Sequence, residues 1–131
     1  MKILIVDDFA TMRRIIKNLL RDLGFNNTSE ADSGDAALST LRGDNFDLLI
    51  TAWNMPNMPG IELLKTIRGE EKLKKLPVLM VTSEAKREPI VQAAYAGVNG
   101  YIVKPFTAET LKMKIARIFE RIAVTTPEEQ K

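Results

Sequence analysis

Residues 3–8 read Ile3-Leu4-Ile5-Val6-Asp7-Asp8, four aliphatic residues without a polar break followed by two carboxylates. An unbroken apolar run of this length is typical of a strand that is covered on both faces, as in a parallel sheet. The two acids then stand at the carboxyl end of the strand, the edge at which ligands collect in open α/β sheets. We expect the rest of the chain to pack on this strand or to send side chains toward the two acids.

The composition indicates an ordinary globular chain and excludes several kinds of chemistry. The 131 residues are 45% hydrophobic and 27% charged, which suits one domain with a proper core. A net charge of +2 is too small to imply nucleic-acid binding. Because the chain has no Cys and no His, disulfides, thiol nucleophiles, the usual zinc sites and a histidine base are excluded.

No segment suggests export or membrane insertion. The apolar run after Met1 and Lys2 has only four residues before Asp7, which is too short for a secretory signal. No apolar stretch approaches the length that spans a bilayer. We therefore predict a cytoplasmic protein without membrane insertion.

Strand-like and helix-like segments alternate along the chain. The pattern predicts strands at residues 3–6, 28–31, 46–52, 78–82 and 101–103, and helices at 9–23, 34–43, 61–68, 89–97 and 108–122. This alternation is typical of an α/β fold, here (βα)5, a doubly wound parallel five-stranded sheet with helices on both faces. The polar segment 28–31 suits an edge, which favours the flavodoxin-like order 2-1-3-4-5. Residues 1–124 then form one domain, and residues 125–131 a polar, frayed C-terminal tail.

The first predicted helix has an apolar face and a basic face. The apolar positions, at helical spacing, are Phe9, Met12, Ile15, Ile16, Leu19, Leu20 and Leu23. The basic positions, interpreted as a solvated face, are Arg13, Arg14, Lys17 and Arg21. Helix-end signals elsewhere are Ser33 and Thr107 as caps, and Gly24, Gly43 and Gly97 as stops.

The predicted strand order brings the carboxyl ends of strands one, three, four and five to one edge. There it gathers Asp7, Asp8, the segment Ala52–Asn54, Thr82 and Lys104. Adjacent carboxylates repel, so a cation is a natural third party, and Mg²⁺ binds proteins through one or two carboxylates. Two simpler interpretations stay open: the acids only cap the first helix, and the lysine is a solvated surface residue.

Several motifs together resemble the response-regulator receiver domain family, and within it the single-domain chemotaxis regulators. They are Val6-Asp7-Asp8-Phe9 with Thr11-Met12-Arg13-Arg14, Trp53-Asn54-Met55-Pro56-Asn57-Met58, Leu76-Pro77-Val78-Leu79-Met80-Val81-Thr82 with Glu84-Ala85-Lys86, and Gly100-Tyr101 with Val103-Lys104-Pro105-Phe106. The resemblance covers residues 1 to about 122. It implies a chemotaxis response regulator of a two-component phosphorelay, a signalling and binding protein rather than an enzyme.

The resemblance also implies roles for the matching positions. Asp7, Asp8 and the backbone carbonyl of Asn54 would hold Mg²⁺. Thr82 would hydrogen-bond a phosphoryl oxygen, and Lys104 would pair with a carboxylate or phosphoryl group across a cis bond to Pro105. The rotating aromatic of the family would be Tyr101.

Two positions depart from the family pattern. The third strand of a receiver domain ends in the aspartate that accepts the phosphoryl group, and here that position is Ala52. Thr51 is a poor substitute, because neighbouring strand residues point to opposite faces. Pro59 stands where the family usually has an acid that caps the next helix, so that capping bond is lost. Proline at the first helical position would limit the resulting loss of helix stability. We therefore expect only weak Mg²⁺ binding.

Ala52 leaves two functions open. The first is a natural degenerate regulator that is not phosphorylated and acts by binding the flagellar motor switch protein or a chemotaxis histidine kinase. The second is a Mg²⁺-dependent phosphotransfer acceptor whose natural aspartate was replaced by engineering. Pro59 favours the first, since engineering one aspartate would not explain it. The partner face would gather Lys86, Tyr95, Tyr101, Lys112 and Lys114, on a monomer that binds no nucleic acid.

Two further functions are disfavoured by the residues themselves. A flavin- or nucleotide-binding protein of the same topology would need a loop that cradles phosphate after the first strand. Asp7 and Asp8 put two negative charges there instead. A hydrolase with an aspartate nucleophile lacks an evident general base.

Overall fold

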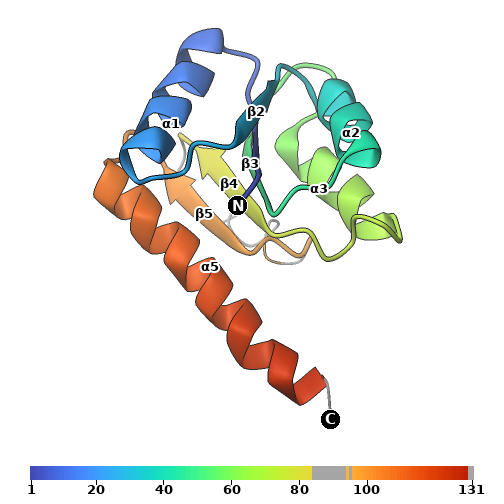
Figure 1. Cartoon of the computed structure of the whole chain (residues 1–131). Helices are drawn as coiled ribbons and strands as arrows, with labels where there is room; N and C mark the ends of the chain where they lie inside the picture. The colour runs from blue at the N-terminus through green and yellow to red at the C-terminus, as the bar shows by residue number, and fades with distance from the viewer. Residues whose placement is uncertain (84–93, 95, 130–131) are drawn as a thin grey trace.

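The computed structural model describes residues 1–83, 94 and 96–129. Strands and helices alternate along this part of the chain (Figure 1). The elements are β1 (Ile3–Val6), α1 (Ala10–Asp22), β2 (Thr28–Ala31), α2 (Gly34–Gly43), β3 (Leu48–Ala52), α3 (Gly60–Gly69), β4 (Val78–Thr82), β5 (Gly100–Val103) and α5 (Ala108–Glu129). The predicted helix at 89–97 lies almost wholly outside the described residues. None of the described helices is long and apolar enough to cross a membrane.

The five strands form one parallel sheet in the order β2-β1-β3-β4-β5. Helices α1 and α5 cover one face of the sheet, and α2 and α3 cover the other (Figure 1). The predicted α/β fold, its strand order and its helices on both faces are therefore confirmed. The polar strand β2 lies at an edge, where only Ala31 is buried among its residues.

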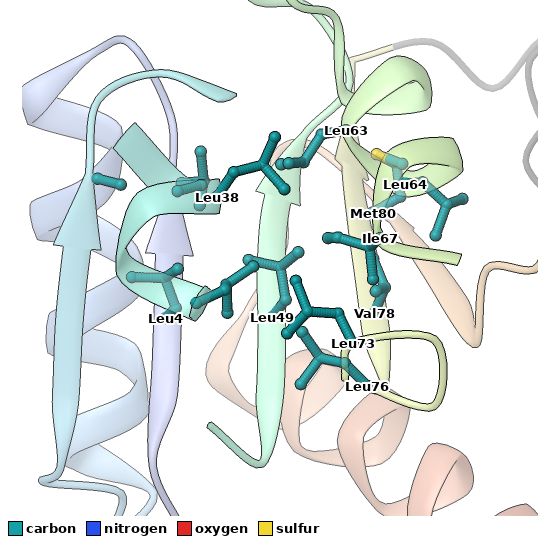
Figure 2. Packing of buried hydrophobic residues seen from close by; sticks show 14 of the residues in the cluster. Leu4, Leu38, Leu49, Leu63, Leu64, Ile67, Leu73, Leu76, Val78 and Met80 are labelled. Atoms are coloured by element: carbon teal, nitrogen blue, oxygen red, sulfur yellow. The ribbon is translucent and has the colours of Figure 1, made fainter. Parts of the chain in front are cut away.

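Strand β1 supplies both cores, because successive side chains of a strand point to opposite faces. Leu4 and Val6 belong to the cluster under α2 and α3, which Figure 2 shows packed around Leu38, Leu49 and Leu64. The odd-numbered residues of the strand, Ile3 and Ile5, belong to the cluster under α1 and α5. Double coverage is what an unbroken apolar run predicts, and all four residues are at most 1% exposed.

The predicted helix-end signals are confirmed where the structure describes them. Ser33 Oγ accepts a hydrogen bond from the backbone N–H of Ala36 at 3.1 Å, and Thr107 Oγ1 accepts one from Thr110 at 3.2 Å. Gly24 follows α1 with φ of +93°, a conformation that glycine adopts at little cost. Gly43 is the last residue of α2.

Four expectations need correction. The third strand begins at Leu48 rather than Phe46. Phe9 and Ile15 are 66% and 45% exposed, since the first stands before α1 and the second lies off its buried stripe. The last helix continues to Glu129, into the predicted tail. Adding a residue to an existing helix is easier than starting one, and it continues here although Pro127 cannot donate an intrahelical hydrogen bond. The fourth concerns Pro59 and is described with the site.

Gly60, the first residue of α3, allows this helix to start directly against the end of β3. A Cβ at this position would lie 2.2 Å from the carbonyl oxygen of Ala52 and 2.9 Å from Met80 Sδ. The N–H of Gly60 also donates to the carbonyl of Trp53 at 2.8 Å. The loop between β3 and α3 is therefore closed tightly at its base, which a side chain would prevent.

We predict that Gly60→Ala lowers the free energy of unfolding by about 2 kcal/mol, the usual scale of overpacking against atoms that cannot move aside. Gly69→Ala is the matched control, because a Cβ at this exposed position of the same helix meets nothing within 4 Å. The control is expected to be neutral or to stabilise by up to about 1 kcal/mol. Urea unfolding measures both, and equal effects of the two substitutions would contradict the close-approach argument.

Candidate functional site

The register of the sheet places the predicted site residues in one row across four strands. Val6 pairs with Thr51, so Asp7 and Ala52 come next on neighbouring strands β1 and β3. Ala52 pairs with Val81, the residue before Thr82 at the end of β4. The N–H of Lys104, just after β5, donates to the carbonyl of Thr82 at 2.8 Å. The backbone thus brings these four positions together at the carboxyl edge of the sheet, as predicted.

Asp7 is buried at this edge and only partly satisfied. The residue is 1% exposed, and Oδ1 accepts a hydrogen bond from the N–H of Phe9 at 2.9 Å. Within the described residues, Asp7 Oδ2 and Asp8 Oδ1 are both buried and have no hydrogen-bond partner. Buried polar atoms are rarely left without a partner, because the loss of water is not repaid. One unpaired oxygen on each of two adjacent acids leaves room for a proton shared between the carboxyls or for a bound cation.

Burial raises the pKa of Asp7 above its ordinary value, and the negative charge of Asp8 raises it further. The Phe9 N–H and the positive charge of Lys104 act in the opposite direction without cancelling the effect of burial. The ionised form of Asp7 therefore costs free energy in the folded chain. A divalent cation would remove that cost, and hard oxygen atoms are the ligands that Mg²⁺ prefers.

Asn54 contributes to the surface beside the acids. Together with Asp8 and Phe9 it lines an open depression whose other walls are Met55, Pro56 and Pro59. No cluster of three or more acidic side chains occurs in the described part of the chain. A cation at this edge would therefore rely on the two carboxylates, a backbone carbonyl and water.

The simpler interpretation of the acids as helix caps fits poorly. Helix α1 has Phe9 at its N-cap position, no side-chain capping bond, and no acidic residue in its first turn. Asp7 does accept the N–H of Phe9, but this leaves its second oxygen unpaired. Capping therefore does not account for both acids.

Ala52 presents a methyl group at the end of β3. The residue is 4% exposed, and the neighbouring Thr51 is fully buried. Thr51 Oγ1 donates to the carbonyl of Ala52 at 3.2 Å, so this hydroxyl is engaged with the backbone. Pro59 stands at the N-cap of α3, not at its first helical position as predicted, and supplies no capping bond. The reason is that Gly60 begins the helix, in close contact with β3.

The other predicted residues are described in part. Thr82 is buried, Lys104 is half-buried, and the Lys104–Pro105 bond is cis, as predicted. Tyr101 is half-buried on β5, with Lys114 Nζ lying 5.3 Å from the centre of its ring. Lys86 and Tyr95 lie outside the described residues.

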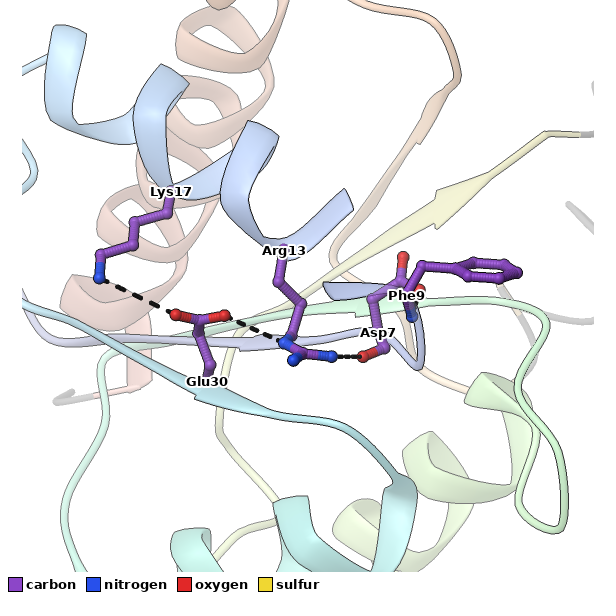
Figure 3. Close-up of polar contacts among 5 residues, drawn as sticks. All are labelled: Asp7, Phe9, Arg13, Lys17 and Glu30. Atoms are coloured by element: carbon purple, nitrogen blue, oxygen red, sulfur yellow. Dashed lines mark hydrogen bonds and ion pairs between the residues drawn. The ribbon is translucent and has the colours of Figure 1, made fainter. Parts of the chain in front are cut away.

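The sequence interpretation missed the part that Arg13 takes at this edge. Its guanidinium donates to the backbone carbonyl of Asp7 at 2.7 Å and to Glu30 Oε1 at 3.0 Å (Figure 3). Its sequence position instead predicts a place on the solvated basic face of the first helix. Its place one turn after the N-cap of α1 was a usable signal, since a long side chain there points back toward the preceding strand end.

We predict that Asp7→Asn, in EDTA at neutral pH, raises the free energy of unfolding by roughly 1–3 kcal/mol, the scale of an unsatisfied buried group. The sign follows from the raised pKa of Asp7, because stability is lost as pH rises through that pKa and the carboxyl ionises. Asp32→Asn removes an exposed carboxylate and is expected to stay within about 0.5 kcal/mol. A destabilised Asp7→Asn chain in urea unfolding would refute the argument.

Comparisons with known proteins agree with the geometry. The family model described as "Response regulator receiver domain" matches residues 3–116. Chemotaxis protein CheY of Pseudomonas aeruginosa is 70% identical over 122 residues, which cover 93% of this chain and 98% of that protein. Chemotaxis protein CheY-3 of Vibrio cholerae is also 70% identical, over 93% of this chain and 94% of its own length.

Solved structures agree as well. Chemotaxis protein CheY4 of Vibrio cholerae superposes with a TM-score of 0.83 at 35% identity, over 89% of this chain and 97% of that chain. A putative response regulator from Chloroflexus aurantiacus gives 0.84 at 32% identity, over 89% and 95%. The chain therefore belongs to the response regulator receiver domain family, and its place there is with the CheY chemotaxis regulators of two-component systems.

Proposed function

We propose that this chemotaxis regulator acts by binding protein partners and does not accept a phosphoryl group at position 52. The observation that carries the proposal is the methyl group of Ala52, buried at the end of β3 beside the acidic edge. In the receiver family this position is the aspartate that receives the phosphoryl group. A methyl group cannot form an acyl phosphate, and the hydroxyl of Thr51 is bonded to the backbone.

The remaining parts of a receiver site support a weak Mg²⁺ site in this proposal. Asp7 Oδ2 and Asp8 Oδ1 would be ligands, with the backbone carbonyl of Asn54 as a third. When bound, the ion supplies positive charge that offsets the two buried carboxylates. Lys104, which lowers the pKa of Asp7, would neutralise part of the same charge. Without a third carboxylate the site would hold the ion loosely.

The alternative proposal is that the natural chain carries an aspartate at position 52 and accepts phosphoryl from a chemotaxis histidine kinase. Phosphoryl transfer depends mainly on positioning and charge neutralisation, and Thr82 and Lys104 stand beside position 52 for both tasks. The alternative and the first proposal share one pocket. They differ only in whether its nucleophile was lost naturally or by engineering.

The partner surface in this proposal is centred on Tyr101 of β5 and on α5. A depression there is lined by Tyr101 together with three basic side chains, Lys114, Arg117 and Arg121. Aromatic and basic groups around a groove favour an acidic amphipathic segment. We infer that the flagellar motor switch protein, or the chemotaxis histidine kinase, presents such a segment. The chain would act as a monomer in the cytoplasm.

We predict that Ala52→Asp binds Mg²⁺ roughly tenfold or more tightly than the chain as written. One added charge at about 4 Å contributes between about 1 and 4 kcal/mol in partly screened surroundings, and about 1.4 kcal/mol is tenfold. The fluorescence of Trp53, next to Asn54, reports the titration. Ala52→Asn, with the same size and no charge, is the matched control and is expected to gain nothing.

The same three proteins test phosphoryl transfer. Each is incubated with a small-molecule phosphodonor and Mg²⁺, and its intact mass is measured. Only Ala52→Asp is expected to gain one phosphoryl group. An added phosphoryl group on the chain as written would refute the proposal. An Ala52→Asp variant that gains no phosphoryl group would show that more than one residue of the site has been lost.

Substitutions on the partner surface are expected to weaken binding to an acidic peptide of a flagellar switch protein. Tyr101→Ala and Lys114→Ala remove the ring and the cation that lie 5.3 Å apart. We expect each to raise Kd about fivefold or more, from a parent value that is already weak, since the binding-competent state is a minor one without phosphorylation. Lys65→Ala, an exposed lysine on α3, is the control. Equal binding by all three variants would place the partner surface elsewhere.

A further inference from the structure

Asp7 stands one residue beyond the end of β1, where the strand ladder no longer fixes the chain on both sides. Its N–H still donates to the carbonyl of Ala31 on β2 at 3.2 Å. Its own carbonyl instead accepts a hydrogen bond from Arg13 Nη1 at 2.7 Å. At this residue a side chain from α1, rather than a neighbouring strand, donates the hydrogen bond to the backbone carbonyl.

The guanidinium of Arg13 is itself held from a third element. Its Nε donates to Glu30 Oε1 at 3.0 Å, and Lys17 Nζ lies 3.8 Å from the other oxygen of Glu30. Figure 3 shows Arg13 between Glu30 and Asp7, joining α1, β2 and the end of β1. The Arg13 side chain is only 17% exposed, which distinguishes this contact from an ordinary surface ion pair. The planar fork of an arginine can serve two acceptors at once, as it does here.

These contacts leave Asp7 one free atom. Its N–H, its carbonyl and Oδ1 are each bonded, to Ala31, Arg13 and Phe9 respectively. Oδ2 alone has no partner among the described residues. Fixing the backbone and one carboxylate oxygen also fixes the direction of the second oxygen, which would be the ligand atom.

We propose that Arg13, aimed by Glu30, is a positioning residue that holds Asp7 in the orientation required for cation binding. The inference rests on the Mg²⁺ site of the proposed function. Outer groups that orient a ligand commonly change metal affinity by one or two orders of magnitude when they are removed. Arg13 contacts the backbone carbonyl of Asp7 and not its carboxylate, so it acts on the ligand atom only by positioning Asp7.

The loss of the Arg13 charge and the loss of its contact to Asp7 are expected to change Mg²⁺ affinity in opposite directions. This difference makes the role testable. Arg13 is a cation close to the place where a second cation would bind, so the loss of its charge alone would tighten Mg²⁺ binding. The loss of its support for Asp7 would weaken that binding instead. The sign of the change in affinity therefore separates positioning from simple electrostatics.

The experiment is a MgCl2 titration of the full chain followed by Trp53 fluorescence. Arg13→Gln removes both contacts and is expected to weaken Mg²⁺ binding roughly tenfold. Arg14→Gln removes the same charge from the next, exposed residue, for which the structure shows no hydrogen bond or ion pair within the described chain. We expect this control to bind Mg²⁺ as tightly as the parent or slightly more tightly.

If Arg13→Gln fails to fold, the Arg13→Lys variant tests whether Arg13 positions Asp7 for Mg²⁺ binding. A lysine keeps the charge but not the planar fork, so it cannot hold Glu30 and the Asp7 carbonyl together. Weaker Mg²⁺ binding by this variant supports the inference, and parent-like binding overturns it. Unchanged or tighter binding by folded Arg13→Gln also overturns it. If the parent chain itself shows no response to Mg²⁺, the proposed metal site fails and the inference falls with it, which is a distinct outcome.

Discussion

The carboxylates of Asp7 and Asp8 lie where water cannot fully solvate them, and one oxygen of each has no partner in the described chain. Burial raises the pKa of Asp7, so its ionised form is held at the expense of stability. The surrounding structure supplies only partial relief, through the Phe9 N–H and the charge of Lys104. A fold optimised for stability alone would place apolar residues here. In the proposed function a cation would offset this cost, and Ala52, Thr82 and Lys104 lie around the pair at the same edge of the sheet.

The scaffold that holds the pair is rigid because β1 is buried on both faces. Its four apolar residues divide between the two cores, so the strand can neither rotate nor slip without exposing one of them. That register carries across the sheet and places Ala52 beside Asp7, with Thr82 following on the next strand. Gly60 then lets α3 begin against the end of β3, which fixes the loop that contains Asn54. The site is therefore a direct consequence of strand order and close packing.

Much of this organisation followed from pattern alone. Alternating strand and helix signals predicted the parallel sheet, and the polar segment 28–31 favoured its order. Glycine and hydroxyl signals predicted helix ends at Gly24 and Ser33. The errors arose where a local pattern was overruled by a distant contact. Phe9 looked like a core residue by its spacing but stands before the helix, and Pro59 was displaced by one position because Gly60 packs on Ala52.

The sequence by itself determined that two acids would follow a doubly buried strand, that an alanine would stand at the end of the third strand, and that a lysine would follow the last. Those facts depend on residue identity and on periods of two and 3.6 residues, which are local. Only the tertiary structure decided which oxygens of the acids lack partners, and that Arg13 and Glu30 brace the backbone of Asp7. The physical reason is that burial and hydrogen-bond partnership arise between segments far apart in the chain. No periodicity records where the guanidinium of Arg13 will find a carbonyl to bind.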